Sequence, residues 1–315
     1  MLIGALDIGG TKTIVAIANE QGQILAKITF ATHTADFKEH GRLCIQLLEK
    51  LAGECSAELA DLAGIGVSMP GMVDFARGFL LHAPFAGWRD VAVVEYFQTI
   101  LPQGIPVFID NDTNNCALAE VLFGGSGERD YIWMTVSTGI GSTLISDGNL
   151  IAGASFCAGE IGHFRVEEQN PRPCTCGRAG CLEAHASGTA IGRIFREALA
   201  DSSSLRNQLE ANGLSDDAPG CAQLAKLGNP TGMEIYRQAG DYMGKALSWA
   251  VNLLNPAVVF MGGGVSRDLE LLRPAILHRI EAEVVRPSNR VGIRQSQLGY
   301  EASLLGAAAL VLKKL

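Results

Sequence analysis

Apolar positions at the start of the chain follow the pattern of short buried strands separated by tight turns. Residues 2–6 and 13–18 are nearly continuous apolar runs, and a third run begins at residue 23 after a glycine turn. Short apolar runs that end in glycine or polar residues are typical of buried strands. We therefore predict strands and tight turns over residues 2–30.

Further along, the spacing alternates between helix and strand. Leucines at three- and four-residue intervals predict an amphipathic helix over 38–63, and residues 90–101 have a similar character. Apolar runs predict buried strands at 65–68 and 106–109, and a helix follows at 113–122 with Thr113 or Asp112 able to cap it. Residues 187–285 are predicted to be mainly helical, apart from a strand at 258–261, and a helix at 303–315 closes the chain.

The opening pattern returns near the middle of the chain. An apolar strand at 132–136 enters the glycine loop 137–141, a strand follows at 143–145, and a glycine turn comes next, as in residues 2–25. At 315 residues the chain exceeds the size of one ordinary core. Two related α/β domains explain the repeat, and coincidence is the alternative.

Charge and composition argue against several classes of partner. The net charge is −8 and no block of lysine and arginine occurs, which argues against nucleic acid. The richest apolar run, from Ala246, is broken by Asn252, Asn255 and Pro256, so no membrane span is expected. A signal peptide is not expected because Asp7 interrupts any candidate, and mostly scattered cysteines fit a reducing cytoplasm.

Three glycine-rich turns each follow an apolar strand: Gly9-Gly10-Thr11, Thr138-Gly139-Ile140-Gly141 and Gly262-Gly263-Gly264. Glycine turns let backbone N–H groups surround a phosphate, because no side chain blocks the approach. None matches the Walker A pattern or completes G-x-G-x-x-G. Asp7 lies beside the first turn, as a magnesium–nucleotide site requires. A plain turn explains any one of them, but three together favour nucleotide binding between two domains.

Two carboxylates and an amide, Asp110, Asn111 and Asp112, stand where the strand at 106–109 ends. A simple helix cap is one explanation of this cluster. In a functional explanation, one aspartate is the general base that takes a proton from a substrate hydroxyl as it attacks phosphorus. The pattern does not distinguish Asp110 from Asp112 in that role.

Three thiols within eight residues form the strongest local signal: Cys174, Cys176 and Cys181. Their spacing, with glycines between them, suits tetrahedral zinc, whereas a disulfide is the alternative that a reducing compartment disfavours. The spacing leaves the fourth ligand open between His185, four residues after the last cysteine, and His163, eleven before the first. Glu160 and Glu183 nearby could bind sugar hydroxyls or lie on the surface.

Seven motifs, taken together and in order, resemble the ROK family of bacterial sugar kinases and repressors within the actin/hexokinase-like superfamily. They are LDIGGTK at 6–12, SMPGMVD at 68–74, DNDTNNCALAE at 110–120, STGIG at 137–141, AGEIGH at 158–163, CTCGRAGCLE at 174–183 and VVFMGGGVS at 258–266. The resemblance implies a two-domain α/β actin-like (ribonuclease H-like) ATPase fold with an interdomain cleft. It implies a first domain at 1–115, joined by the C-terminal helix at about 301–315, and a second at 116–300 that carries the zinc loop.

The resemblance also implies roles for individual residues. Asp7 would lie near Mg²⁺, and the residues around ATP would be Gly9, Gly10, Thr11, Lys12, Thr138, Gly139, Gly262, Gly263 and Gly264. Asp112 would be the catalytic base, and the sugar contacts would be Gly71, Asn111, Asp112, Glu160, His163 and Glu183. Structural Zn²⁺ would be bound by His163, Cys174, Cys176 and Cys181, with the other ring nitrogen of His163 on the sugar and His185 a bystander.

The expected activity is therefore ATP-dependent phosphorylation of a hexose at its 6-hydroxyl, as in a glucokinase. The alternatives are an N-acetylmannosamine or N-acetylglucosamine kinase, and a non-catalytic sugar-sensing protein. Family repressors carry a helix-turn-helix segment before the first motif, whereas only six residues precede Asp7 here. Family members are often dimers or tetramers, so a homodimer or homotetramer is expected.

Two segments depart from the family pattern. Ser142 and Thr143 follow Gly141, where many family kinases continue with glycine, and their side chains are expected to narrow the phosphate cleft. The stretch 83–87 before Trp88 lacks the asparagine often found in family glucokinases, so the motif does not identify the hexose.

Overall fold

The chain folds into two compact units of mixed α/β structure. The computed structural model describes residues 1–33 and 35–315. The first unit contains residues 1–127, 150–158 and 297–315, and the second contains 128–149 and 159–296. The division expected after residue 115 falls inside helix α3 (Asp112–Phe123), all of which belongs to the first unit.

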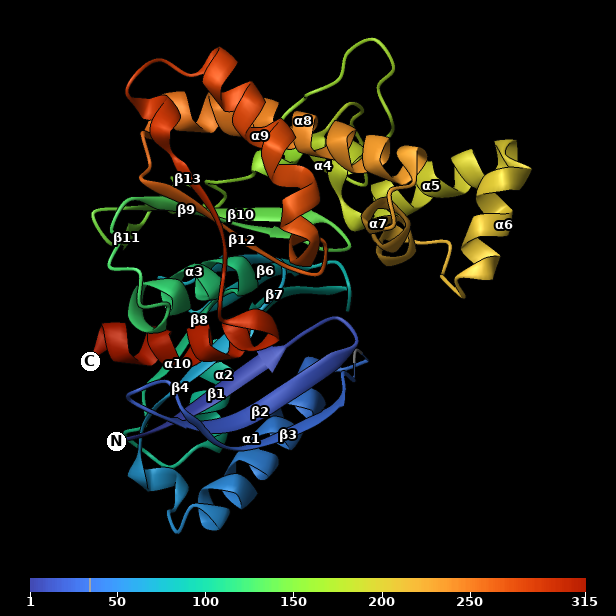
Figure 1. Cartoon of the computed structure of the whole chain (residues 1–315). Coiled ribbons are helices and arrows are strands. Elements are labelled where there is room, and N and C mark those ends of the chain that lie inside the picture. Colours follow the sequence, from blue (N-terminus) through green and yellow to red (C-terminus); the bar gives the residue numbers. More distant parts are fainter. Residues whose placement is uncertain (34) are drawn as a thin grey trace. The chain divides into compact units, whose positions relative to one another are not determined.

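The first unit is built on a five-stranded sheet in the order β3-β2-β1-β4-β8 (Figure 1). Its strands are β1 (Leu2–Ile8), β2 (Lys12–Asn19), β3 (Ile24–Ala31), β4 (Leu62–Met69) and β8 (Val107–Asn111). Strands β1, β4 and β8 are parallel, so their carboxyl ends share one edge. The register places Asp7, Ser68 and Asp110 side by side at this edge.

Helices cover both faces of this sheet. On β1, Leu6 and Ile8 belong to the core shared with α1 (Phe37–Glu54) and α2 (Val93–Ile100). Ile3 and Ala5 point the other way, into the core shared with α10 (Ala302–Lys314). Because alternate side chains point to opposite faces, Asp7 lies on the α10 face and Thr13, in line with Val15, on the α1 face.

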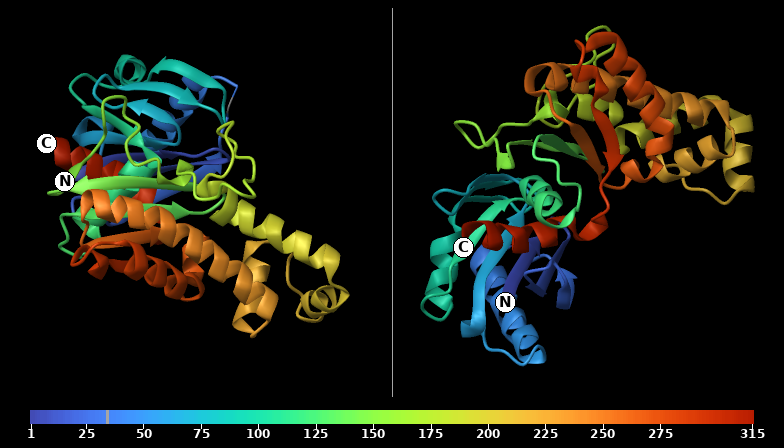
Figure 2. Two further views of the ribbon diagram at one scale, coloured as in Figure 1. Left: turned by 90° about the horizontal axis from the view of Figure 1, so that it is seen from above. Right: turned by 60° about the vertical axis from the view of Figure 1, so that its left-hand side comes forward.

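Helix α10 lies very close to the sheet and to α3 (Figure 2). A Cβ at Gly66 of β4 would stand 1.8 Å from the carbonyl oxygen of Ala307, and one at Gly306 would stand 2.0 Å from that of Asn115. Only glycine fits at either position. The C-terminal residues are therefore an integral part of the first unit.

A three-stranded antiparallel sheet was not predicted from the sequence. It contains β5 (Met72–Asp74), β6 (Phe79–Ala83) and β7 (Trp88–Ala92), so the helix expected from residue 90 begins only at Val93. The helix expected over 38–63 is also too long. It ends at Glu54, Ser56 has a left-handed backbone with φ of 59°, and a 3-10 turn (Leu59–Asp61) leads into β4.

The sheet of the second unit has the order β11-β10-β9-β12-β13, which repeats that of the first. Its strands are β9 (Tyr131–Val136), β10 (Ile140–Ser146), β11 (Asn149–Leu150), β12 (Val258–Gly262) and β13 (Gly292–Gln295). In both sheets an antiparallel hairpin precedes two parallel strands. The repeat seen in the sequence is thus confirmed as a repeat of topology.

The remaining helices belong to the second unit. They are α4 (Leu182–Ala186), α5 (Gly188–Asp201), α6 (Ser203–Ala211), α7 (Ala218–Lys226), α8 (Pro230–Leu254) and α9 (Leu269–Glu283), with 3-10 turns at Ile161–His163 and Val265–Asp268. Two further 3-10 turns are Ser288–Arg290 and, in the first unit, Gly299–Glu301. Within the described residues, no helix is long and apolar enough to cross a membrane.

Candidate active site

The first glycine turn joins β1 to β2, and protein donors hold its carbonyl groups. Gly9 N donates to Lys12 O at 3.0 Å, and Thr32 N donates to Thr11 O at 3.1 Å. The hydroxyl of Thr32 donates to Gly9 O at 2.7 Å. Gly10, Thr11 and Lys12 are exposed. A turn with its carbonyl oxygens tied to the protein and its amides at the surface suits an anion such as phosphate.

Asp7 is half-buried at the end of β1, on the α10 face. The Ser303 hydroxyl donates to its Oδ1 at 2.8 Å and also lies 2.6 Å from the Ser68 hydroxyl. Burial raises the pKa of Asp7 to about 6; the Asp112 carboxylate also raises it, whereas Ser303 and Lys12 lower it. A cation beside Asp7 would favour the ionised form, so the carboxylate fits a Mg²⁺ site.

The N-cap of α3 is Asn111, not Thr113 or Asp112 as the sequence suggested. Its Oδ1 accepts from Thr113 N at 2.8 Å, and its Nδ2 donates to Gly71 O at 2.8 Å. Gly71 has a φ of 125°, and a Cβ there would stand 2.3 Å from His82 O. Two residues predicted to contact the sugar, Gly71 and Asn111, are therefore joined directly.

Asp110 and Asp112 have different surroundings. Asp110 is buried, and its Oδ1 accepts from Asn111 N at 2.7 Å and from Asn114 Nδ2 at 2.8 Å. Asp112 is half-buried, and its Oδ1 accepts from Thr113 N at 2.9 Å. Burial raises the pKa of both carboxyls. Asp110 serves the local structure, so Asp112 is the better candidate for a general base.

In the second unit, carbonyl oxygens of the loop 137–141 accept hydrogen bonds from protein donors, as those of the first turn do. Ser137 O accepts from Gly188 N at 2.7 Å, and Thr138 O accepts from Thr189 N at 3.4 Å, both donors lying at the start of α5. Ser137 N donates to Gly139 O at 2.9 Å. Its carbonyl groups are thus also held by protein donors.

A pocket of about 340 Å³ lies within the second unit. Residues 138–139 of the glycine loop, the cysteine loop and the start of α5 line it, with side chains that include Thr138, Thr175, Glu183, Thr189 and Arg193. Glu183 accepts from Ile140 N at 2.9 Å and from the Thr175 hydroxyl at 3.2 Å. The predicted sugar contact Glu183 therefore also joins the loop 137–141 to the cysteine loop.

The third glycine turn, 262–264, ends β12 beside β9, and the register pairs Gly262 with Thr135. A Cβ at Gly262 would stand 2.5 Å from the Trp133 ring. Gly263 has a φ of 88°, and a Cβ there would stand 2.4 Å from Val136 O. Close packing requires both glycines, and this turn lies next to the start of the loop 137–141.

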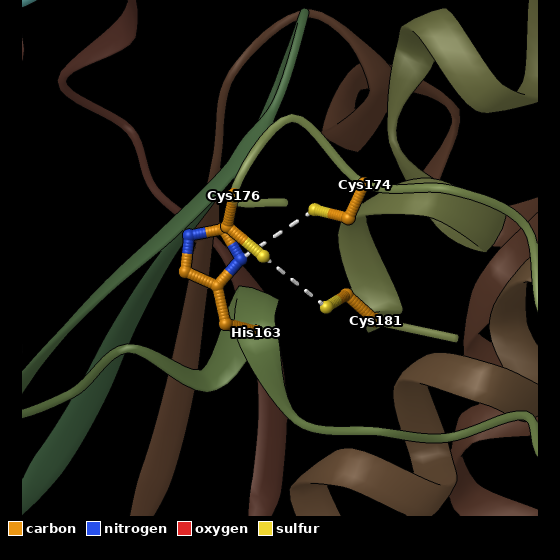
Figure 3. Close-up of side chains that lie close together, drawn as sticks. All are labelled: His163, Cys174, Cys176 and Cys181. Carbon is orange, nitrogen blue, oxygen red and sulfur yellow. Dashed lines mark hydrogen bonds between the residues drawn. The ribbon is translucent and has the colours of Figure 1, made fainter. Parts of the chain in front are cut away.

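The predicted metal ligands come together in the second unit (Figure 3). One ligand atom from each of His163, Cys174, Cys176 and Cys181 lies within 4.8 Å of the others. The sulfur atoms of Cys176 and Cys181 are 3.7 Å apart, as are Cys174 Sγ and His163 Nδ1. Zinc–sulfur bonds of about 2.3 Å give a tetrahedral edge of about 3.8 Å, so the four side chains fit zinc.

The cysteine loop does not contain a disulfide. All eight cysteines, each within the described part of the chain, are unpaired. Gly177 and Gly180 have φ angles of 84° and 81°, which allows the tight turns between the ligands. His185 lies outside the cluster: its Nε2 accepts from Arg172 N at 3.2 Å, and its ring packs at a tilt against that of Tyr242, with centroids 4.9 Å apart.

His163 has two different ring environments. Its Nδ1 faces the sulfur atoms, and its Nε2 is 3.9 Å from Glu160 Oε2. The segment 159–163 rests on β10, where the Ser142 hydroxyl donates to Gly159 O. Thr143 is buried. The Ser142 hydroxyl is therefore engaged with the segment that carries Glu160 and His163.

Several residues at these sites were not indicated by any sequence pattern. Ser303 reaches Asp7 from 296 positions away, and Thr32, just after the end of β3, reaches Gly9 from 23 positions away. Arg193, whose guanidinium donates to Ala184 O at 2.7 Å, lines the pocket through helix packing. Contacts between residues so far apart depend on tertiary structure.

Comparisons with known proteins give the family of the chain. The ROK family profile matches residues 3–314. A glucokinase of Halalkalibacterium halodurans is 32% identical over 97% of this chain and 93% of the relative. A ROK family glucokinase from Streptomyces griseus, solved with glucose and AMPPNP, has a TM-score of 0.80 and 29% identity over 99% of this chain and 100% of that one. The Escherichia coli DNA-binding transcriptional repressor Mlc is 30% identical over 80% of this chain and 61% of the repressor.

Proposed function

Because the chain belongs to the ROK family, we propose that it is a glucokinase-like enzyme that phosphorylates the 6-hydroxyl of a hexose. It is an ATP-dependent sugar kinase. The observation that carries the assignment of the base is Asp112 at the start of α3, a carboxylate close enough to raise the pKa of Asp7. One carboxylate would deprotonate the sugar while the other holds the cation of MgATP.

Individual side chains and backbone amides would have separate roles in the reaction. Asp112 would take the proton of the attacking hydroxyl, and its raised pKa makes it a better proton acceptor. The exposed amides of the first turn would offset phosphate charge, together with Lys12, Thr138 and Gly139. Asp7 would hold Mg²⁺, which neutralises charge on the phosphates. Gly262, Gly263 and Gly264 would bind the adenosine part.

The sugar would be held by groups that match neighbouring hydroxyls. Asn111, fixed by Gly71 O, would bind it from the first unit, and Glu160, His163 and Glu183 from the second. Hydroxyls of this kind are also present in N-acetylmannosamine and N-acetylglucosamine, which are the alternative substrates. The S. griseus glucokinase was solved with glucose, which favours a hexose without an acyl group.

Zinc would be structural in this enzyme. A zinc ion bound through Nδ1 of His163 would fix the ring so that Nε2 carries a proton and can donate to the sugar. Unpaired cysteines and the use of ATP support a cytoplasmic location. We also propose a homodimer or homotetramer, as in many family members.

An ADP-release assay with magnesium-ATP tests the proposed function. It compares glucose, mannose, fructose, allose, N-acetylglucosamine and N-acetylmannosamine at equal concentrations, and the 6-deoxy form of the preferred sugar is the control. We expect one preferred hexose and no turnover of its 6-deoxy form. Turnover of the 6-deoxy sugar would contradict the 6-hydroxyl assignment. No turnover of any sugar by zinc-containing protein would favour a sugar-sensing protein.

A further inference from the structure

A hydrogen-bonded chain runs from helix α1 to the first glycine turn. His40 of α1 and Thr13 of β2 are fully buried, and His40 Nε2 lies 2.9 Å from the Thr13 hydroxyl. That hydroxyl is 2.9 Å from the hydroxyl of Thr32, which donates to Gly9 O at 2.7 Å. At the other end, His33 N donates to His40 Nδ1 at 3.3 Å.

The backbone groups at the two ends of this series of hydrogen bonds determine which atom donates in each of them. Gly9 O can only accept, so Thr32 donates to it; Thr13 must then donate to Thr32, and His40 Nε2 must donate to Thr13. His33 N can only donate, so His40 Nδ1 accepts. The imidazole is therefore neutral with its proton on Nε2. Burial lowers the pKa of His40 to about 4, with a smaller contribution from the charge of His33. This agrees with a neutral ring.

The last link of the chain controls the orientation of one peptide group. In a trans peptide the carbonyl of Gly9 and the N–H of Gly10 point in opposite directions. Holding the carbonyl inward therefore holds the N–H outward. The peptide is flanked by two glycines, which have no Cβ to resist rotation. A flip would turn a carbonyl oxygen outward, where it would repel a phosphate.

We propose that His40 is a positioning residue for nucleotide binding, which acts through Thr13 and Thr32 to keep the Gly10 amide directed at the phosphates of ATP. The proposal rests on the assignment of this turn to ATP in the proposed function. Among the described residues, none accepts a hydrogen bond from Gly10 N or Thr11 N. Those amides are thus available to a ligand.

A purely structural role for His40 is the competing explanation. Its ring also contacts Phe30, with centroids 5.5 Å apart, and Trp88, at 6.0 Å. Loss of these contacts would lower stability without any preference for the nucleotide. Variants that remove hydrogen bonds but keep volume separate the two explanations.

The test uses His40→Leu, Thr32→Val and His40→Gln in the whole chain. Calorimetry measures the dissociation constants of magnesium–AMPPNP and of the preferred sugar, and steady-state assays give KM for each substrate. We expect His40→Leu and Thr32→Val to weaken AMPPNP about 10-fold, the effect of one lost hydrogen bond, and to leave sugar binding within twofold. His40→Gln keeps a donor near Nε2 and should restore most of the affinity. Thr29→Val, at an exposed position of β3 three residues before Thr32, is the matched control and should change neither constant.

Several results would overturn the proposal. One is an unchanged AMPPNP constant in both His40→Leu and Thr32→Val; another is an equal loss of sugar and nucleotide affinity. If these variants do not fold, the ¹⁵N spectrum of His40 in the parent protein at pH 7 still tests the proposal. A proton on Nδ1 would contradict the series of hydrogen bonds from His40 to Gly9. If no sugar is phosphorylated but Thr32→Val weakens AMPPNP selectively, the proposed function fails and this inference stands. No binding of AMPPNP to the parent protein would overturn both.

Discussion

Asp110 and Asp112 stand two positions apart where β8 meets α3, and burial raises the pKa of both. Their hydrogen bonds distinguish them. The amide of Asn114 and the backbone of Asn111 fix Asp110, whereas Asp112 bonds only locally, to Thr113, in the described structure. At the scale of residues, function thus depends on partners that the sequence pattern does not reveal.

We expect Asp112→Asn to lower kcat by about 1,000-fold or more, because the amide cannot accept the proton of the attacking hydroxyl. Sugar affinity should stay within a few-fold, since the amide keeps the size and polarity of the side chain. Coupled kinetics and calorimetry measure the two quantities. Asp110→Asn is the matched control and should keep most of the activity. The reverse result would assign the base to Asp110.

Asp110→Asn should also change how stability depends on pH. The folded-state pKa of Asp110 is about 6, against about 3.9 in an unfolded chain. Between these values the folded state holds a proton that the unfolded state has lost, so Asp110 destabilises the fold increasingly as pH rises from 4 to 6. The variant lacks this penalty. Its stability relative to the parent should rise by up to about 2 kcal/mol over that range and then level off.

Chemical denaturation of parent and variant at pH 4.5, 5.5, 6.5 and 7.5 measures this difference. The Asn side chain can still accept from Asn111 N and Asn114 Nδ2 through its Oδ1, so the hydrogen bonds are conserved. A difference in stability that does not change with pH would show that Asp110 ionises normally in the folded protein.

At the scale of elements, α10 and the cysteine loop each supply contacts that no other element makes in the described structure. Helix α10 covers one face of the first sheet and brings Ser303 to Asp7. The cysteine loop brings three thiols to His163 and places Thr175 on Glu183. Each element thus joins a stabilising contact to a residue of the candidate site.

Gly66→Ala should destabilise the protein by about 2–3 kcal/mol, because the new methyl group would lie within 1.8 Å of Ala307 O and force α10 away from β4. Gly53→Ala is the matched control, since Gly53 lies in α1 with no atom within 4 Å of the added carbon. That change should leave stability unchanged or raise it by up to about 1 kcal/mol. Thermal and urea unfolding measure both. Equal effects would contradict the close packing of α10.

Loss of zinc should lower the melting temperature and weaken sugar binding together, because the same ion would fold the cysteine loop and orient His163. Mass spectrometry of the metal content should find one zinc per chain in the parent protein and much less in Cys176→Ser. Cys157→Ser, a thiol outside the cluster, is the control and should keep its zinc. Full stability and sugar affinity in zinc-free protein would contradict the structural role.

At the scale of the whole molecule, the predicted site residues are divided between two units that have the same strand order. Asp7, Asn111 and Asp112 belong to the first unit, and Glu160, His163 and the cysteines to the second. The repeated topology explains why a glycine turn follows the first strand of each sheet, at Gly9 and at Gly139. The same strand-turn-strand topology therefore occurs in both units.

The net charge of −8 leads to a prediction that separates kinase from repressor. A negative chain without a basic block repels DNA phosphates and gains little from counterion release. We expect no gel shift of double-stranded DNA at micromolar protein in 150 mM salt, with or without sugar. A sugar-sensitive shift by this chain would favour a regulatory role.

The sequence by itself determined the strands, the glycine turns and the ligand types, because these follow from local pattern and from chemistry that few residues can perform. Nearly continuous apolar runs predicted β1, β2 and β9, and the cysteine spacing predicted three of the four side chains in the cluster. It missed β5 to β7, whose short runs have no strong period, and placed the end of α1 too late.

Only the tertiary structure decided which residues support the site. The contact of Ser303 with Asp7 and that of Thr32 with Gly9 join residues far apart in the chain. The cluster places His163, which the resemblance had implied as a ligand, beside three cysteines that lie 11 or more positions away. Such contacts form where sheet register and helix packing bring side chains together. Local sequence pattern carries no information about those distances, because they are set by burial of the whole core.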